Sequence, residues 1–424
     1  MSFMSSQEEL QAWLRLTLEP GVGPVTARQL LAVFGLPDQV FAASVGQLMK
    51  YLPQKLALQL AAEPVPEIQA LIHKTFEWLA KPKHYILTLA DPLYPKSLLD
   101  THDPPILLYV DGNPELFALP AIAMVGARNA TIGGSDNARA FAKYLASQGW
   151  CVVSGLAHGI DAAAHEGALE APAGTGSTIA VMGTGINRLY PAANKNLALR
   201  IREQGALVSE LPLDTPAVVH QFPRRNRIVA GLSKGVLVVE AAKQSGSLIT
   251  ARLAGEMGRE VFAIPGSIHS PLSRGCHALI RQGAKLVETA QDIQEELTGV
   301  PGQGIKAGSG RTIKRGMQDP SLDGTTSKMP KKPGQEQELP GMESVESVQP
   351  GGIAPAAVQN NTSDFVLGPE QLHLLERMGF EPLSLDALIN DLQIDVAQAS
   401  SWLLALELGS YVVRLNDGRY QRLR

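Results

Sequence analysis

The chain has 424 residues, a formal net charge of −4 and 45% apolar residues, so we expect a large core and roughly two to four domains. The near-neutral charge excludes a uniformly basic surface, and any nucleic-acid site must therefore be a local patch. Two cysteines without a CxxC spacing argue against structural zinc and a disulfide framework, and they favour a reducing compartment. The sequence shows neither a signal-peptide pattern nor a membrane-spanning apolar run, so we expect a soluble, cytoplasmic protein without a membrane partner.

The first predicted domain, residues 1–80, contains short helices. At its centre, residues 19–35 place Gly21 and Gly23 ahead of an amphipathic helix, as in a helix-hairpin-helix. Such a turn offers backbone N–H groups to a phosphate. A helical packing unit without a ligand has the same pattern, and the residues do not decide between the two.

The second predicted domain, residues 81–298, begins with two apolar strand-like runs around Pro-rich turns in residues 84–117. From Ala121 onward, apolar strands alternate with helices, which indicates βαβ units and a doubly wound, parallel α/β sheet. The predicted strands are almost purely apolar, as expected when helices cover both faces of a sheet. They span residues 121–126, 151–155, 178–183, 206–211, 235–240 and 260–266.

The C-terminal part of the chain divides into a linker and a third domain. Residues 299–363 contain no Phe, Tyr or Trp and are rich in Gly, Pro, Ser and Gln, which predicts a disordered linker. Residues 364–424 indicate two helices and a hairpin that turns at 416–418, the outline of a winged helix. Its second helix carries Asp395 and Glu407 but no basic residue, which argues against reading of duplex DNA. We therefore favour a protein-contact role for this domain.

Turns suited to phosphate binding follow several predicted strands, at the sheet edge where ligands of open α/β sheets bind. The first turn carries Gly126 and Arg128. It lacks the GxGxxG spacing and an acidic residue about 20 positions later, which disfavours a nicotinamide dinucleotide. The Arg128 guanidinium offers a planar fork to a phosphate. An arginine that bonds loop carbonyls would fit this turn equally well.

The stretch FPRRNRIVAGLS, residues 222–233, gathers three arginines beside an aromatic ring. We expect Arg224 and Arg225 at a helix N-terminus, where cations are unfavourable unless an anion lies between them. A phosphate is therefore predicted there, and Phe222 could stack a base beside it. Tyr190, at another strand end, could also stack a base, but a packing role is favoured.

The remaining candidates are less specific. The turn of residues 244–247 leads into a helix and offers N–H groups and hydroxyls, and Arg274 lies in a similar turn. His158, Asp161 and His165 are of metal-ligand type and share one predicted helix face. They lack both a tight His pair and a fourth ligand, so we predict no metal site.

The turns carry no recognisable catalytic machinery. There is no Walker A lysine, nucleophile elbow or pair of carboxylates, and Glu240 is the one plausible general base. Several phosphate sites without catalytic groups indicate a bound strand of nucleic acid rather than a nucleotide that is turned over. We therefore predict a non-enzymatic protein without a cofactor.

Six motifs, in order, resemble the DNA-processing protein A (DprA/Smf) family. They cover nearly all of residues 121–285 and read MVGARNAT, SGLAHGIDAAAHEGAL, GTGINRLYPAANKNL, FPRRNRIVAGLS, AAKQSGSLITA and IPGSIHSPLSRGCHALIRQGA. The resemblance implies an extended Rossmann-like domain that binds single-stranded DNA, with a small helical domain before it and a winged helix after it. It also implies loading of the RecA recombinase onto incoming DNA during natural transformation, without a catalytic step, and a homodimer formed through the Rossmann domain.

The resemblance also assigns roles to residues. It implies that Arg128 grips a phosphate and that Phe222 stacks a base, with Arg225 and Arg227 at the same pocket. Some family members have a lysine at the position of Val219, so one phosphate contact is expected to be missing or replaced here. The predicted DNA-binding residues are Gly126, Arg128, Phe222, Arg224, Arg225, Asn226, Arg227, Ser245, Gly246, Ser247 and Arg274.

An alternative of another class is a nucleotide phosphoribohydrolase-like enzyme on a Rossmann fold. Such enzymes carry the motif PGGxGTxxE, whose glutamate helps to break an N-glycosidic bond. This chain has QSGSLITA at the comparable turn, and Glu240 precedes that turn instead of following it.

Overall fold

The computed structural model describes residues 7–298 and 367–424, except residues 410, 416 and 424. The predicted linker, residues 299–363, lies outside the described residues, as does position 416 of the predicted hairpin turn. Within the described ranges, no helix has the length and apolar character needed to cross a membrane.

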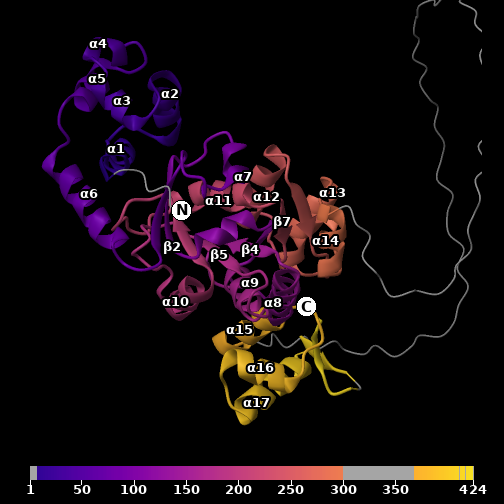
Figure 1. The fold of residues 1–424 in the computed structure, drawn as a ribbon. Coiled ribbons are helices and arrows are strands. Elements are labelled where there is room, and N and C mark those ends of the chain that lie inside the picture. The colour runs from indigo at the N-terminus through magenta and orange to yellow at the C-terminus, as the bar shows by residue number, and fades with distance from the viewer. Residues whose placement is uncertain (1–6, 299–366, 410, 416, 424) are drawn as a thin grey trace, which may run out of the picture. The chain divides into compact units, whose positions relative to one another are not determined.

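Six helices form the N-terminal region, coloured indigo to purple in Figure 1. Leu16, Leu30 and Leu60 from three of these helices are fully buried in their common core. Gly21 adopts a φ of +88°, which permits the predicted tight turn between the first two helices. The helices are α1 (Gln7–Leu18), α2 (Pro24–Phe34), α3 (Pro37–Ala42), α4 (Val45–Leu48), α5 (Gln54–Ala61) and α6 (Pro66–Leu79).

A sheet of nine strands follows, in the order β1-β2-β6-β5-β4-β3-β7-β8-β9. The strands β3 to β9 pair in parallel, which confirms the predicted doubly wound sheet. The sheet as a whole is mixed, because β2 pairs antiparallel with both β1 and β6. The strands are β1 (His84–Thr88), β2 (Leu107–Gly112), β3 (Ala121–Val125), β4 (Cys151–Ser154), β5 (Thr178–Val181), β6 (Ala206–Ser209), β7 (Gly235–Val238), β8 (Glu260–Ala263) and β9 (Lys285–Leu286).

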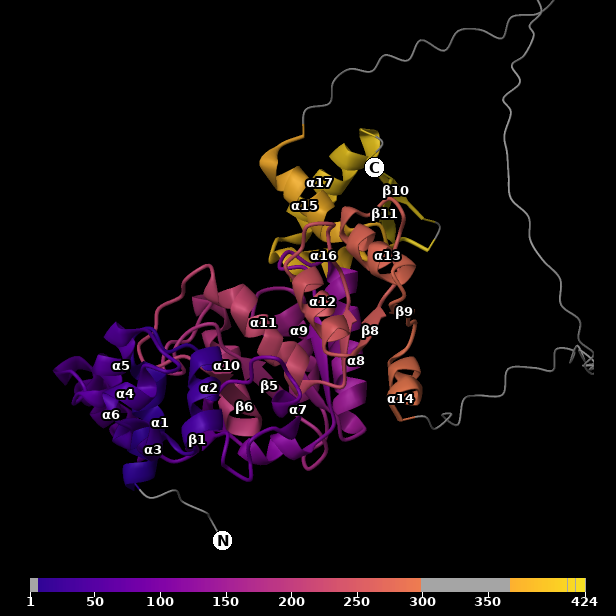
Figure 2. The same cartoon turned by 90° about the horizontal axis from the view of Figure 1, so that it is seen from above.

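Helices cover both faces of this sheet, which explains why the central strands β3 to β7 are buried along their length and almost purely apolar. In β3, Ala123 packs into the core layer of α11 and α12, whereas its neighbours Ile122 and Met124 pack into the layer of α8 and α9. Helices α8 and α9 lie side by side in both views (Figure 1, Figure 2). The helices are α7 (Lys96–Leu99), α8 (Ile132–Ser147), α9 (Ile160–Leu169), α10 (Lys195–Gln204), α11 (Gln221–Leu232), α12 (Ser247–Glu256), α13 (Arg274–Arg281) and α14 (Ala290–Thr298), with 3-10 turns at Pro114–Ala118, Ala192–Asn194 and Pro271–Ser273.

The strand order changes direction between β3 and β7. From β3 the chain proceeds outward through β4, β5 and β6, and it then returns to place β7 on the other side of β3. Open α/β sheets bind ligands at such a switch point, beyond the carboxyl ends of the strands. The turns that follow β3 and β7 are therefore the expected walls of a binding site.

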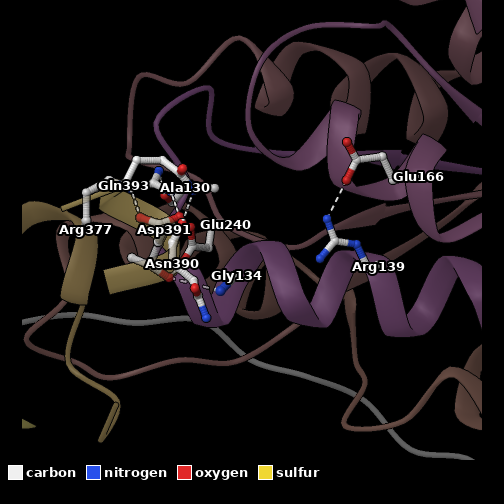
Figure 3. A network of polar contacts seen from close by, with 10 residues as sticks. Ala130, Gly134, Arg139, Glu166, Glu240, Arg377, Asn390, Asp391 and Gln393 are labelled. Atoms are coloured by element: carbon white, nitrogen blue, oxygen red, sulfur yellow. Dashed lines mark hydrogen bonds and ion pairs between the residues drawn. The ribbon is translucent and has the colours of Figure 1, made fainter. Parts of the chain in front are cut away.

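The C-terminal residues form the predicted winged helix, with an antiparallel hairpin and three helices, one helix more than the two predicted. Arg377 donates hydrogen bonds to Asp391 and thereby ties the first of these helices to the second (Figure 3). Asp395 caps the third helix by accepting a bond from the Gln398 N–H. The elements are α15 (Pro369–Met378), α16 (Leu385–Leu392), α17 (Val396–Leu408), β10 (Val412–Arg414) and β11 (Tyr420–Arg422).

Candidate nucleic-acid interface

A cavity of about 520 Å³ lies at the switch point of the sheet. Its walls come from the turns after β3, β4 and β7 and from the start of α11. It brings together most of the DNA-binding residues predicted from the sequence, although those residues are spread over more than 120 positions. The predicted residues in its lining are Gly126, Arg128, Phe222, Arg225, Asn226, Ser245, Gly246 and Ser247.

Arg128 is the accessible cation of this cavity. Its side chain is exposed, and it makes no hydrogen bond or ion pair with any residue that the structure describes. The alternative in which this arginine bonds loop carbonyls is therefore not what the structure shows. A free guanidinium at the rim can grip a phosphate with two parallel hydrogen bonds.

Arg225 has a different role from Arg128, because it is buried in the cavity floor. Its guanidinium donates to the Gly155 carbonyl, 2.7 Å away, and to the Val181 carbonyl, at the ends of β4 and β5. Burial lowers the pKa of Arg225 to about 10, while the charge of Asp161 raises it and that of Arg128 lowers it further. Arg225 therefore stays charged at neutral pH and acts as a fixed cation beneath the site.

The other predicted arginines lie outside the cavity lining. Arg227 is buried and forms ion pairs with Asp103, 3.2 Å away, and with Glu210. Successive helical residues are about 100° apart, so Arg225 and Arg227 point in nearly opposite directions from α11. Arg227 thus ties α11 to neighbouring loops, while Arg224 and Arg274 are exposed outside the cavity.

Two aromatic rings meet at the start of α11. Phe222 lines the cavity, and the ring of Tyr190 lies beside it, with 5.5 Å between the ring centroids. A Cβ at Gly183 would lie 2.7 Å from the Phe222 ring, so the glycine makes room for that side chain. Tyr190 packs against Phe222 on one side, and 49% of its surface is exposed. We therefore add Tyr190 to the candidate site as a second stacking surface.

The wall that follows β7 is polar and uncharged. Helix α12 begins at Ser247, so its first backbone N–H groups lie at the cavity, where they favour an anion. The hydroxyls of Ser245 and Ser247 are 2.6 Å apart. Asn129 and Gln244 also line the cavity and were absent from the predicted set; each lies next to a predicted residue in a turn that the sequence did identify.

Of the three predicted side chains of metal-ligand type, Asp161 and His165 are bound to protein groups, whereas His158 is exposed. Asp161 accepts hydrogen bonds from the backbone N–H groups of Gly155 and Ala157. The Nδ1 atom of His165 lies 2.7 Å from the Thr178 hydroxyl. In the ranges that the structure describes, no group of three His, Cys, Asp or Glu residues is placed to hold a metal ion.

The burial of His165 predicts a pH dependence of stability. Burial lowers the pKa of His165 from 6.5 to about 3, assisted by the charge of Arg225. Thr178 donates its hydroxyl hydrogen to the Val152 carbonyl, so it accepts from Nδ1–H of a neutral imidazole. The unfolded chain therefore binds the proton more tightly, and the contribution of His165 to stability is lost as the pH falls from 6.5 towards 3. This loss should reach up to about 1.4 kcal/mol per pH unit.

Urea denaturation at a series of pH values between 7 and 4 measures this loss. The free energy of unfolding of His165→Gln should fall less steeply with decreasing pH than that of the parent chain, by up to about 1.4 kcal/mol per pH unit. His158→Gln is the matched control, because His158 is exposed just ahead of the same helix. Parallel profiles for the parent and His165→Gln would show that His165 does not set the acid sensitivity.

Comparisons with known proteins agree with this architecture. Residues 85–298 match the family model described as DNA recombination-mediator protein A, and residues 358–418 match the DprA winged helix domain. The chain is 49% identical over 229 residues to Protein Smf of Escherichia coli, a match that covers 53% of this chain and 60% of that protein. It is 30% identical over 429 residues to Protein Smf of Synechocystis, covering 98% of this chain and all of that protein. Among solved structures, DNA processing protein A from Streptococcus pneumoniae superposes with a TM-score of 0.59 and 36% identity, over 70% of this chain and 99% of that one.

Proposed function

The chain belongs to the DNA recombination-mediator protein A (DprA/Smf) family, and from this premise we propose that it is a single-stranded DNA-binding recombination mediator. In this proposal it protects incoming DNA and loads the RecA recombinase onto it during natural transformation. It acts without a catalytic step and works as a homodimer joined through its α/β domain.

The observation that carries the DNA-binding proposal is the cavity at the switch point. It combines an unpaired arginine, Arg128, and the N-terminus of helix α12 for phosphates with the Phe222 ring for bases. The ring of Tyr190 lies beside that of Phe222. Groups that bind phosphates, together with aromatic rings that stack on bases, are suited to a nucleic-acid strand whose bases are unpaired. A duplex hides the faces of its bases, and helix α17 of the winged helix carries no Lys or Arg with which to read one.

The position of Glu240 supports the proposal of a non-enzymatic protein over a phosphoribohydrolase. Both of its carboxylate oxygens accept hydrogen bonds from Thr131, at 2.9 Å from its backbone N–H and 2.6 Å from its hydroxyl. A general base needs an oxygen that is free to take a proton from the reacting group. These two hydrogen bonds therefore favour a structural role for Glu240 at the end of strand β7.

Fluorescence anisotropy with labelled oligonucleotides tests the binding proposal on the full chain. We expect the chain to bind a single strand at least about tenfold more tightly than a duplex of the same length. Affinity should fall as salt rises, because bound arginines displace counterions. Equal affinity for both forms, or binding that salt leaves unchanged, would contradict the proposed site. Faster RecA filament formation on single strands in the presence of the chain tests the loading role.

A further inference from the structure

Glu240 follows strand β7 and holds the start of helix α8. Its Oε2 accepts the Thr131 backbone N–H, and its Oε1 accepts the Thr131 hydroxyl. Thr131 is the N-cap of α8, because its Oγ1 accepts the Gly134 N–H at 3.0 Å. Figure 3 shows Glu240 beside Gly134 at the first turn of α8. One carboxylate therefore connects the end of β7 to the cap of α8.

The same turn carries Arg128, and its other end is held by helix α9. The Ile160 N–H donates to the Ala127 carbonyl at 3.1 Å. A Cβ at Gly159 would lie 2.5 Å from the Arg128 carbonyl oxygen, so α9 approaches the backbone of the turn closely. Helix α9 thus holds the turn at Ala127, next to Arg128, and Glu240 holds it at Thr131, three residues after Arg128.

We propose that Glu240 is a positioning residue, which holds the turn after β3 so that the Arg128 side chain faces the strand-binding cavity. The inference rests on the proposed function, since it assigns to Glu240 the placement of the phosphate-gripping arginine. Glu240 itself is absent from the cavity lining, so it acts through the turn and not by touching DNA.

Adjacent glycines in α8 provide a matched test of this role. A Cβ at Gly134 would lie 2.4 Å from the Glu240 carboxyl carbon, so an alanine there must displace the carboxylate. A Cβ at Gly133 would meet nothing closer than 3.9 Å. Both substitutions replace glycine by a better helix former in the same turn, and they differ in their contact with Glu240.

The experiment measures single-strand affinity by anisotropy for the full chain and its variants Gly133→Ala, Gly134→Ala, Arg128→Ala and the double variant Gly134→Ala with Arg128→Ala. We expect Gly133→Ala to bind like the parent chain and Gly134→Ala to bind about tenfold more weakly, the effect of one misplaced charge-assisted hydrogen bond. The double variant should bind like Arg128→Ala alone. Such non-additivity shows that Gly134→Ala acts through Arg128, which a general loss of stability would not produce.

A second pair of variants covers the case in which Gly134→Ala does not fold, as judged by circular dichroism. Thr131→Ser keeps the hydroxyl and should retain parental affinity, whereas Thr131→Val removes it and should weaken binding like Gly134→Ala. Parental affinity in Gly134→Ala and Thr131→Val, or additive losses with Arg128→Ala, would overturn the inference while the proposed function stands. Failure of both the parent and Gly133→Ala to bind a single strand would instead overturn the proposed function, and the inference with it.

Discussion

Replacing Arg225 by alanine is expected to lower the free energy of unfolding by about 3–5 kcal/mol. The substitution leaves the Asp161 carboxylate, buried beneath the cavity, without its compensating cation. It also removes the donor of the Gly155 and Val181 carbonyls at the ends of β4 and β5. Single-strand binding should be lost as well, because the cavity floor is no longer held.

Urea denaturation of the variants Arg225→Ala and Arg224→Ala tests this expectation. Arg224 is the adjacent residue of the same helix, but it is exposed, so its replacement should change stability by no more than about 0.5 kcal/mol. Burial raises the pKa of Asp161, and protonation removes its charge. The stability deficit of Arg225→Ala should therefore shrink as the pH is lowered. Equal stability of the two variants would show that Arg225 is not the support of the floor.

The central sheet could be predicted from the sequence because its signals are local. Most of the parallel strands are short apolar runs followed by a turn and a helix, and β3 to β8 lie within the predicted ranges, whereas the two-residue parallel strand β9 was not predicted. The antiparallel pairing of β2 with β6 could not be predicted in this way. It joins residues about 100 positions apart, as in the pair of Val110 with Val208, and no turn between them fixes a direction.

The arginines of helix α11 occupy different positions because of where the helix begins, and the sequence does not mark that start. His220 precedes α11 without a side-chain cap, so no N-cap pattern shows that the helix begins at Gln221. Given that start, helical geometry directs Arg225 into the cavity floor and Arg227 away from it. The contact of Glu240 with Thr131 spans 109 positions and leaves no local pattern in the sequence.

Phe222→Ala and Arg128→Ala are expected to weaken single-strand binding in ways that a salt titration separates. Loss of the Phe222 ring should cost about 1–3 kcal/mol of base stacking and leave the salt dependence nearly unchanged, because stacking releases no counterions. Loss of Arg128 removes one phosphate contact, so the slope of log affinity against log salt should flatten by about 0.7. Tyr190→Ala should resemble Phe222→Ala, since the two rings are neighbours.

Tyr85→Ala is the matched aromatic control, because Tyr85 is 39% exposed on strand β1 and outside the cavity lining. It should change neither affinity nor salt slope. Circular dichroism and thermal melting of each variant confirm that affinity is compared between folded chains. If Phe222→Ala binds like Tyr85→Ala, the ring is not a base platform. If Arg128→Ala keeps the parental slope, its guanidinium contacts no phosphate, and the strand must follow another path across the sheet edge.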